Sequence, residues 1–75
     1  MLKADGFDDA IVGIGRRCGQ PDLLVYDVER CIKILTKDGM TDEEAEDYFE
    51  FNVVGAWVGE DTPMFLYREI GDEEI

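Results

Sequence analysis

The sequence predicts a small α+β domain in the order α-β-α-α-β, with three helices packed on a short two-stranded sheet. Three observations predict this class: apolar residues recur at helical spacing in three segments, two short runs are β-prone, and glycine or proline punctuates the segments. With 75 residues, of which 45% are hydrophobic, the chain is expected to form one domain over residues 1–70. Residues 71–75 are expected to be a frayed acidic tail.

The first helix is predicted over residues 7–18. Apolar side chains at helical spacing there are Phe7, Ala10, Ile11, Ile14 and Cys18. Gly19 stands where a C-terminal capping glycine belongs, and Pro21 prevents continuation. Gly13 and Gly15 weaken this helix, because each costs about 1 kcal/mol relative to alanine.

A strand and a second helix follow. Residues 23–26 form a short β-prone run, and Asp27 is placed to cap the helix that begins after it. One apolar stripe runs along that helix, made of Val28, Cys31, Ile32 and Leu35. Gly39 ends the helix, and Cys31 is interpreted as a small core residue.

The third helix opens with a capping box of Thr41 and Glu44. Its apolar side is formed by Ala45, Phe49, Val53 and Ala56. Residues 63–67 are predicted to be a closing strand that pairs with the first strand, while the helices pack on one face of the pair.

Charge is unevenly distributed. The net charge is −12, yet residues 1–37 hold six basic and six acidic side chains and are neutral. Residues 38–75 hold thirteen acidic side chains and only one cation, Arg68. Such a field repels phosphate backbones and anionic membranes, so we expect neither nucleic acid nor membrane as a partner. A basic protein surface is the natural complement, although acidic charge can also serve only to keep a small protein soluble.

The third helix carries an acidic outer face. Its residues are Asp42, Glu43, Glu46, Asp47 and Glu50. Like charges spaced four residues apart cost a few tenths of a kcal/mol per pair, and no lysine or arginine lies within residues 38–63 to relieve them. The face is therefore either a solvated surface or a recognition surface, and we include all five residues in the candidate partner-binding site.

Trp57 is the only tryptophan, and it lies between Gly55 and Gly59, where the helix frays or turns. Tryptophan in a small domain is commonly a core residue, but it is also a frequent interface anchor. Because Glu60 and Asp61 follow it, all three join the candidate partner-binding site while both interpretations stay open.

Catalytic and metal chemistry are not expected. The chain has no histidine, and Cys18 and Cys31 do not form a C-x-x-C motif, so we predict no enzyme, cofactor or metal site. The glycines of "GIGRRCG" resemble a dinucleotide pattern, but the chain is too short for a dinucleotide-binding fold. "KDGMTDEE" lacks the ligand spacing of a calcium loop. With no signal or membrane-spanning segment, we expect reduced thiols and a cytoplasmic protein.

The run "DGMTDEEAEDYFEFNVVGAWVGEDTP", together with "LLVYD" before an amphipathic helix, resembles a group of small uncharacterised acidic proteins encoded by tailed bacteriophages and prophages. The likeness covers roughly residues 7–66. It implies a context, expression in an infected bacterium, but no catalytic residue, ligand or activity. Small acidic phage proteins often bind and block host proteins, including nucleic-acid-handling and defence complexes.

Three functions therefore stand as hypotheses. The first is an inhibitor that binds a basic host protein, either at any basic surface or at its nucleic-acid site as a charge mimic. The second is a small structural or accessory phage protein that acts by self-association, which the small core of a chain of this size also favours. The third is a sponge for a signalling nucleotide, whose pocket would need Arg16, Arg17, Arg30 and Lys33.

Overall fold

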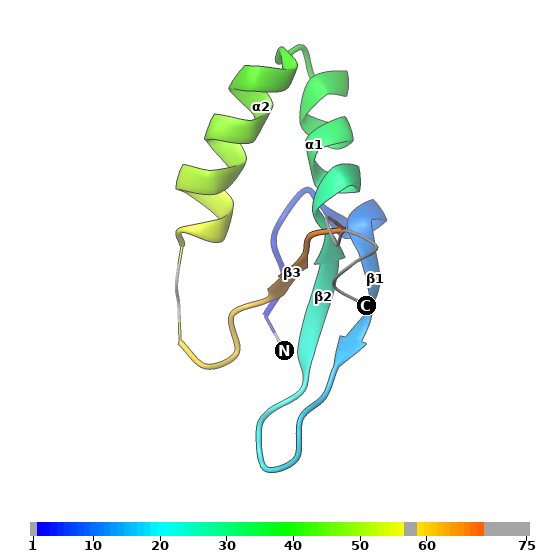
Figure 1. The fold of residues 1–75 in the computed structure, drawn as a ribbon, viewed down its shortest axis with the longest axis vertical. Coiled ribbons are helices and arrows are strands. Elements are labelled where there is room, and N and C mark those ends of the chain that lie inside the picture. The colour runs from blue at the N-terminus through cyan, green and yellow to red at the C-terminus, as the bar shows by residue number, and fades with distance from the viewer. Residues whose placement is uncertain (1, 57–58, 69–75) are drawn as a thin grey trace, which may run out of the picture.

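A computed structural model describes residues 2–56 and 59–68. Its elements are the 3₁₀ turn η1 (Asp8–Ala10), β1 (Ile11–Gly15), β2 (Leu23–Asp27), α1 (Val28–Lys37), α2 (Asp42–Phe49), the π-helical turn η2 (Glu50–Val54) and β3 (Met64–Leu66). The two α-helices lie side by side at one end of the molecule, and the three-stranded sheet occupies the other end (Figure 1). The α+β class is confirmed, but this part of the chain has two α-helices and three strands instead of three and two.

The predicted helix over residues 7–18 is wrong. The chain makes only the short turn η1 and then the strand β1, which pairs antiparallel with β2. Ile11, Val12 and Ile14 are β-branched and favour a strand, while two glycines weaken a helix at the same place. Phe7 and Ala10, which the helical spacing assigned to the core, are nevertheless buried.

A hairpin loop joins β1 to β2. Arg16 donates two hydrogen bonds to Asp22 across its base, from Nε to Oδ1 at 3.0 Å and from Nη2 to Oδ2 at 2.9 Å. Gly19 has a φ of +77°, which suits glycine in a turn better than any other residue. The residue expected to cap a helix therefore closes a hairpin.

The predicted strand at residues 23–26 and the helix after it are confirmed. Asp27 caps α1 by accepting a hydrogen bond from the backbone N–H of Glu29 at 3.0 Å. Its carboxylate is buried and also contacts Arg30 at 3.7 Å and Arg68 at 3.3 Å. After the helix, Gly39 takes a φ of +107° and turns the chain toward α2.

The capping box that opens α2 is confirmed. The backbone N–H of Glu44 donates to the Thr41 hydroxyl at 3.2 Å, and the backbone N–H of Thr41 donates to the Glu44 carboxylate at 3.0 Å. The expected helix continues only as the π-turn η2, which ends before Gly55. Ala56 lies beyond the Gly55 that caps this turn and is exposed, whereas Val53 within the turn is partly buried.

The closing strand is confirmed as β3, and it pairs with β2 in parallel, with Tyr26 opposite Phe65. The strand β2 is therefore central, with β1 on its other side. In Figure 1 the helices extend beyond the end of the sheet, so they do not cover a whole face of it.

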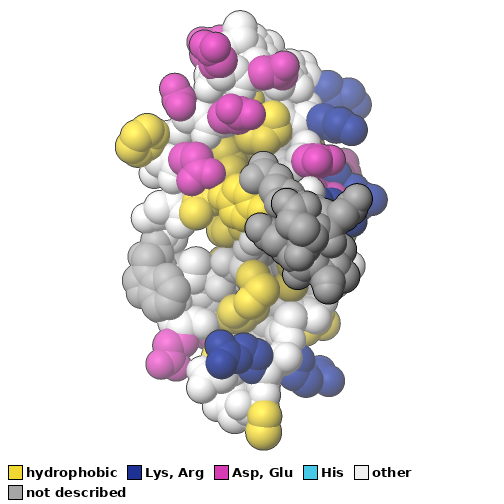
Figure 2. Space-filling model, in the orientation of Figure 1, with side chains coloured by type: hydrophobic (Ala, Val, Ile, Leu, Met, Phe, Trp, Pro, Cys, Tyr) yellow, Lys and Arg dark blue, Asp and Glu magenta, His cyan; other side chains and the backbone are white. Residues whose placement is uncertain are grey.

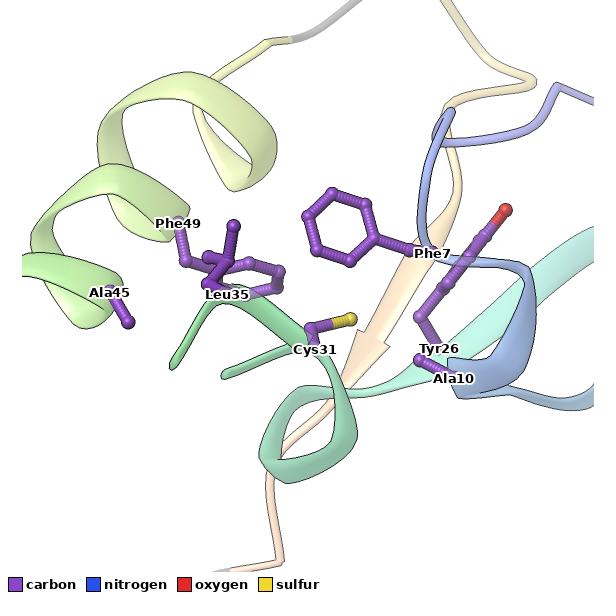
Figure 3. Close-up of a cluster of buried hydrophobic side chains, with 7 residues drawn as sticks. All are labelled: Phe7, Ala10, Tyr26, Cys31, Leu35, Ala45 and Phe49. Carbon is purple, nitrogen blue, oxygen red and sulfur yellow. The ribbon is translucent and has the colours of Figure 1, made fainter. Parts of the chain in front are cut away.

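The core lies where the helices meet the sheet. Its buried side chains are Phe7, Ala10, Tyr26, Cys31, Leu35, Ala45 and Phe49, and Figure 3 shows them converging from the two helices, β2 and the N-terminal segment. Phe49 packs edge-on against Phe7 and Phe65, with ring centroids 6.2 and 5.3 Å apart. The Tyr26 hydroxyl accepts a hydrogen bond from the Ala4 backbone N–H at 2.8 Å, which holds the N-terminal segment. Trp57 and the tail at residues 71–75 lie outside the described residues.

Candidate protein-interaction groove

A groove of about 700 Å³ lies between α1 and α2. Its apolar lining is Val28, Ile32 and Phe49, and Tyr67 stands at its edge after β3. Charged side chains form the rim: Glu29 and Lys33 from α1, Asp42, Glu46 and Asp47 from α2, and Glu50 from the start of η2. We call this site the acidic groove.

Helical spacing explains why these side chains meet. Val28 and Ile32 are one turn apart, so they lie on the same side of α1 and present a continuous apolar strip. The same spacing relates Asp42 and Glu46 on α2 to Glu50 at the start of η2, which places three carboxylates in a row along the groove. The apolar strip of one helix therefore lies beside the acidic row of the other.

The α2 carboxylates are not neutralised from within the part of the chain that the structure describes. Its ion pairs join Lys3 to Asp8, Arg16 to Asp22, and both Arg30 and Arg68 to Asp27. None of them involves a carboxylate of α2. The Glu50 carboxylate accepts a hydrogen bond from the Tyr67 hydroxyl at 2.8 Å, a contact that leaves its charge in place.

Figure 2 shows the resulting separation of charge on one face of the molecule. Acidic side chains gather over α2 beside an apolar strip, and basic side chains lie on the flank beyond it. Lys33 is the one cation that lines the groove within the described residues. The groove thus combines an apolar floor with a strongly negative rim.

Glu44 has a different role from its neighbours on α2. Hydrogen bonding with Thr41 lowers the pKa of the Glu44 carboxyl. The bond from the Thr41 backbone has the larger effect, and the bond with the Thr41 side chain has the smaller one. This carboxylate stabilises the start of the helix and does not line the groove. The acidic helix therefore divides into a capping carboxylate and a set of groove carboxylates.

The structure brings together only half of the predicted partner-binding residues. Asp42, Glu46, Asp47 and Glu50 line the groove, whereas Glu43 is exposed outside it. Glu60 and Asp61 lie in the turn before β3, which Figure 1 places at the opposite end of the molecule from the start of α2. Trp57 lies outside the described residues.

Sequence reasoning missed the α1 side of the groove. Glu29 and Lys33 form its second rim, and Val28 and Ile32 form much of its floor. The signal for the floor was present, because both residues belong to the predicted apolar stripe, but their partial exposure depends on how the helices cross. The pairing of β3 with β2 was predicted, but the contact of Tyr67 with Glu50 at the groove also depends on where α2 and η2 lie and was not.

The two cysteines are free and differ in environment. Cys18 is exposed in the hairpin loop, whereas Cys31 is buried. Burial first, and the nearby Asp27 carboxylate second, raise the pKa of the Cys31 thiol to about 11. Such a thiol is a poor nucleophile at neutral pH, because the reactive form is the thiolate. Within residues 2–56 and 59–68, no three acidic or cysteine side chains are grouped to hold a metal ion.

The basic residues that a nucleotide pocket would need do not meet in one cavity of the described structure. Arg16 is paired with Asp22, Arg30 with Asp27, and Arg17 borders a small recess that Glu60 also lines. Of these four basic residues, only Lys33 lines the acidic groove.

Comparisons of the chain with protein-family models, curated proteins and solved structures give no match. Over the part of the chain that the structure describes, neither helix has the length and apolar character needed to cross a membrane. The geometry of the acidic groove is therefore the main guide to function.

Proposed function

We propose that this chain is a non-enzymatic binding protein whose acidic groove takes up a basic segment of another protein. One observation supports this function above all others. Three carboxylates of α2 and that of Glu50 at the start of η2 line an apolar groove, and no ion pair within the described residues neutralises them.

The two parts of the groove would have different effects on binding. Burial of the Val28 and Ile32 side chains under apolar side chains of the partner supplies affinity, at roughly 25 cal/mol per Å² of apolar surface removed from water. The carboxylates chiefly raise the association rate and select a partner of opposite charge, and this contribution falls as salt is added. The fitting partner has apolar side chains on one side of a segment and Lys or Arg beside them.

The resemblance to tailed-phage proteins supplies a biological setting for this proposal. In an infected bacterium the partner would be a host protein with a basic surface, such as a nucleic-acid-handling or defence complex. A surface that binds phosphate backbones is rich in Lys and Arg, so the acidic groove would occupy it in place of nucleic acid and inhibit the complex.

The decisive experiment compares two variants of equal net charge. The groove variant replaces the four groove carboxylates (D42N/E46Q/D47N/E50Q), and the control variant replaces four carboxylates outside the groove (D38N/E43Q/E60Q/D61N). Each is titrated with a synthetic amphipathic helix of Lys and Leu, at low and high ionic strength. A helix of Glu and Leu serves as the peptide control.

We expect the groove variant to bind the basic peptide roughly tenfold more weakly at low salt, mainly through a slower association rate. The control variant should bind nearly as well as wild type, and high salt should reduce the difference. Equal losses in the two variants would mean that only net charge matters, and would contradict a defined site. A capture from bacterial lysate with mass spectrometry should then identify a basic protein that the control variant retains and the groove variant loses.

A further inference from the structure

Lys33 is the exception to the negative charge of the acidic groove. It lines the groove from α1, and no other lysine or arginine of the described residues does so. Lys33 is exposed, and none of the ion pairs within the described part of the chain involves it. Its charge is therefore available to a ligand in the groove.

The two sides of the groove differ in their pattern of charge. On the side of α2 and η2 every charged residue is acidic, and Asp42, Glu46 and Glu50 stand at every fourth position. On the side of α1, Glu29 is followed four residues later by Lys33, so this side is negative and then positive. A ligand in the groove would thus meet carboxylates along one edge and a cation on the other.

The cation and the carboxylates are kept apart across the groove. Figure 2 shows acidic side chains over α2, an apolar strip beside them, and basic side chains on the far side of that strip. Among the described residues no ion pair joins Lys33 to Glu29 or to a carboxylate of α2. The apolar floor therefore separates two sides whose charges a ligand can contact independently.

These patterns do not suit a ligand that is basic on both edges. A cation placed beside Lys33 would be repelled and a carboxylate attracted, because the two groups would lie well within the Debye length of about 10 Å at 0.1 M salt. The other edge should carry Lys or Arg at every fourth position. An α-helix repeats this spacing at about 6 Å per step, and apolar grooves commonly take up amphipathic helices.

We propose that Lys33 selects, as the occupant of the acidic groove, an amphipathic helix whose edge toward α2 is basic and whose edge toward α1 carries a carboxylate. This inference rests on the proposed function and adds to it the charge pattern of the partner. Turning a helix end for end exchanges the edges that face α1 and α2. The pairing of Lys33 with the carboxylate therefore also fixes the direction in which the helix binds.

Two peptides of identical composition and net charge test this pattern. Both are amphipathic helices of Leu and Lys that contain a single Glu. In the edge peptide the Glu stands beside the apolar stripe, halfway along the helix. In the outer peptide it stands opposite the stripe, where it points to solvent. Because the edge peptide can bind in either direction, it can set its Glu toward α1.

Fluorescence anisotropy at low salt measures the affinity of each peptide. Wild type should bind the edge peptide about threefold more tightly than the outer peptide, an effect typical of an ion pair at a partly solvated rim. Lys33→Gln should lose this preference, and Lys33→Glu should bind the outer peptide more tightly. The matched control, Lys37→Glu, makes the same charge change one turn further along α1 and outside the groove lining. It should keep the wild-type preference.

The groove variant separates a failure of this inference from a failure of the proposed function. If it binds both peptides more weakly, but wild type and Lys33→Glu share the same preference, the pattern assigned to Lys33 is overturned while the groove remains the binding site. If neither peptide depends on the groove carboxylates, the proposed function and this inference are both overturned. Circular dichroism of each variant shows whether a change in affinity arises from a change in the fold.

Discussion

The β1–β2 hairpin and α2 treat their charges in opposite ways. In the hairpin, Arg16 holds Asp22 through two hydrogen bonds, so opposite charges meet within the same chain. On α2, carboxylates follow one another at helical spacing and the described residues supply no ion pair to them. The hairpin thus contains an internal ion pair, whereas no ion pair among the described residues involves the carboxylates of α2.

The largest expected effect on stability comes from the buried side of α2. Phe49→Ala should lower the free energy of unfolding by about 3–5 kcal/mol, because the ring is buried against Phe7 and Phe65. In a domain of this size such a loss is expected to unfold the chain. The matched control is Phe51→Ala, at a side chain that is 80% exposed, and it should change stability by less than about 0.5 kcal/mol. Urea denaturation followed by circular dichroism distinguishes the two.

The next effect concerns the start of α2. Thr41→Ala removes the side-chain half of the capping box and should lower stability by about 0.5–2 kcal/mol. Thr41→Ser keeps the hydroxyl and is the control. An unchanged denaturation midpoint in the alanine variant would mean that tertiary packing alone fixes this helix end.

Neutralising charges in the two regions should change stability in opposite directions. Asp22→Asn breaks the hairpin ion pair and should destabilise the fold slightly. The groove variant removes like-charge neighbours four residues apart, such as Glu46 and Glu50, and should gain a few tenths of a kcal/mol per relieved pair. Thermal unfolding of both variants gives the signs, and destabilisation in both cases would remove the contrast between the regions.

The smallest effect is a dependence on pH. The hydrogen bonds from Arg16 lower the pKa of Asp22, and those from Thr41 lower the pKa of Glu44. Because both folded-state pKa values lie below the unfolded ones, their stabilisation is present above the unfolded pKa and is lost as pH falls through the folded pKa. Asp22→Asn and Glu44→Gln should each make the decline in stability on acidification shallower. Unfolding midpoints measured from neutral to acidic pH would show a parallel decline in all proteins if the two contacts do not matter.

Local sequence signals predicted the parts of the fold whose stabilising contacts are local. The Asp27 cap, the Thr41–Glu44 capping box and the glycine after α1 depend on residues within one turn, and all are found. The segment around Ile11 and Ile14 fits a helix and a strand equally well by spacing. The β-branched side chains and the two glycines favour the strand, and its pairing with β2, a tertiary contact, stabilises it.

The candidate groove was predictable from one side only. The acidic residues of α2 follow from helical spacing, but the position of Val28 and Ile32 opposite them depends on the crossing of the two helices. The turn that carries Glu60 and Asp61 shows the converse. Because Glu60 and Asp61 follow α2 closely in sequence, they were predicted to share one acidic surface with it. In the structure they lie in the turn before β3, away from the start of α2.

The parallel pairing of β2 with β3 has a consequence for the order of folding. Val25 and Met64 are partners across the sheet, yet both helices lie between them in the chain. Contacts so distant along the chain carry a larger loop-closure entropy than those of the hairpin or of adjacent helices, and we expect them to form late. Tyr67, which follows β3 and donates its hydroxyl to Glu50, would then reach the groove only in the final step. The groove with Tyr67 at its edge would thus be complete only in fully folded molecules.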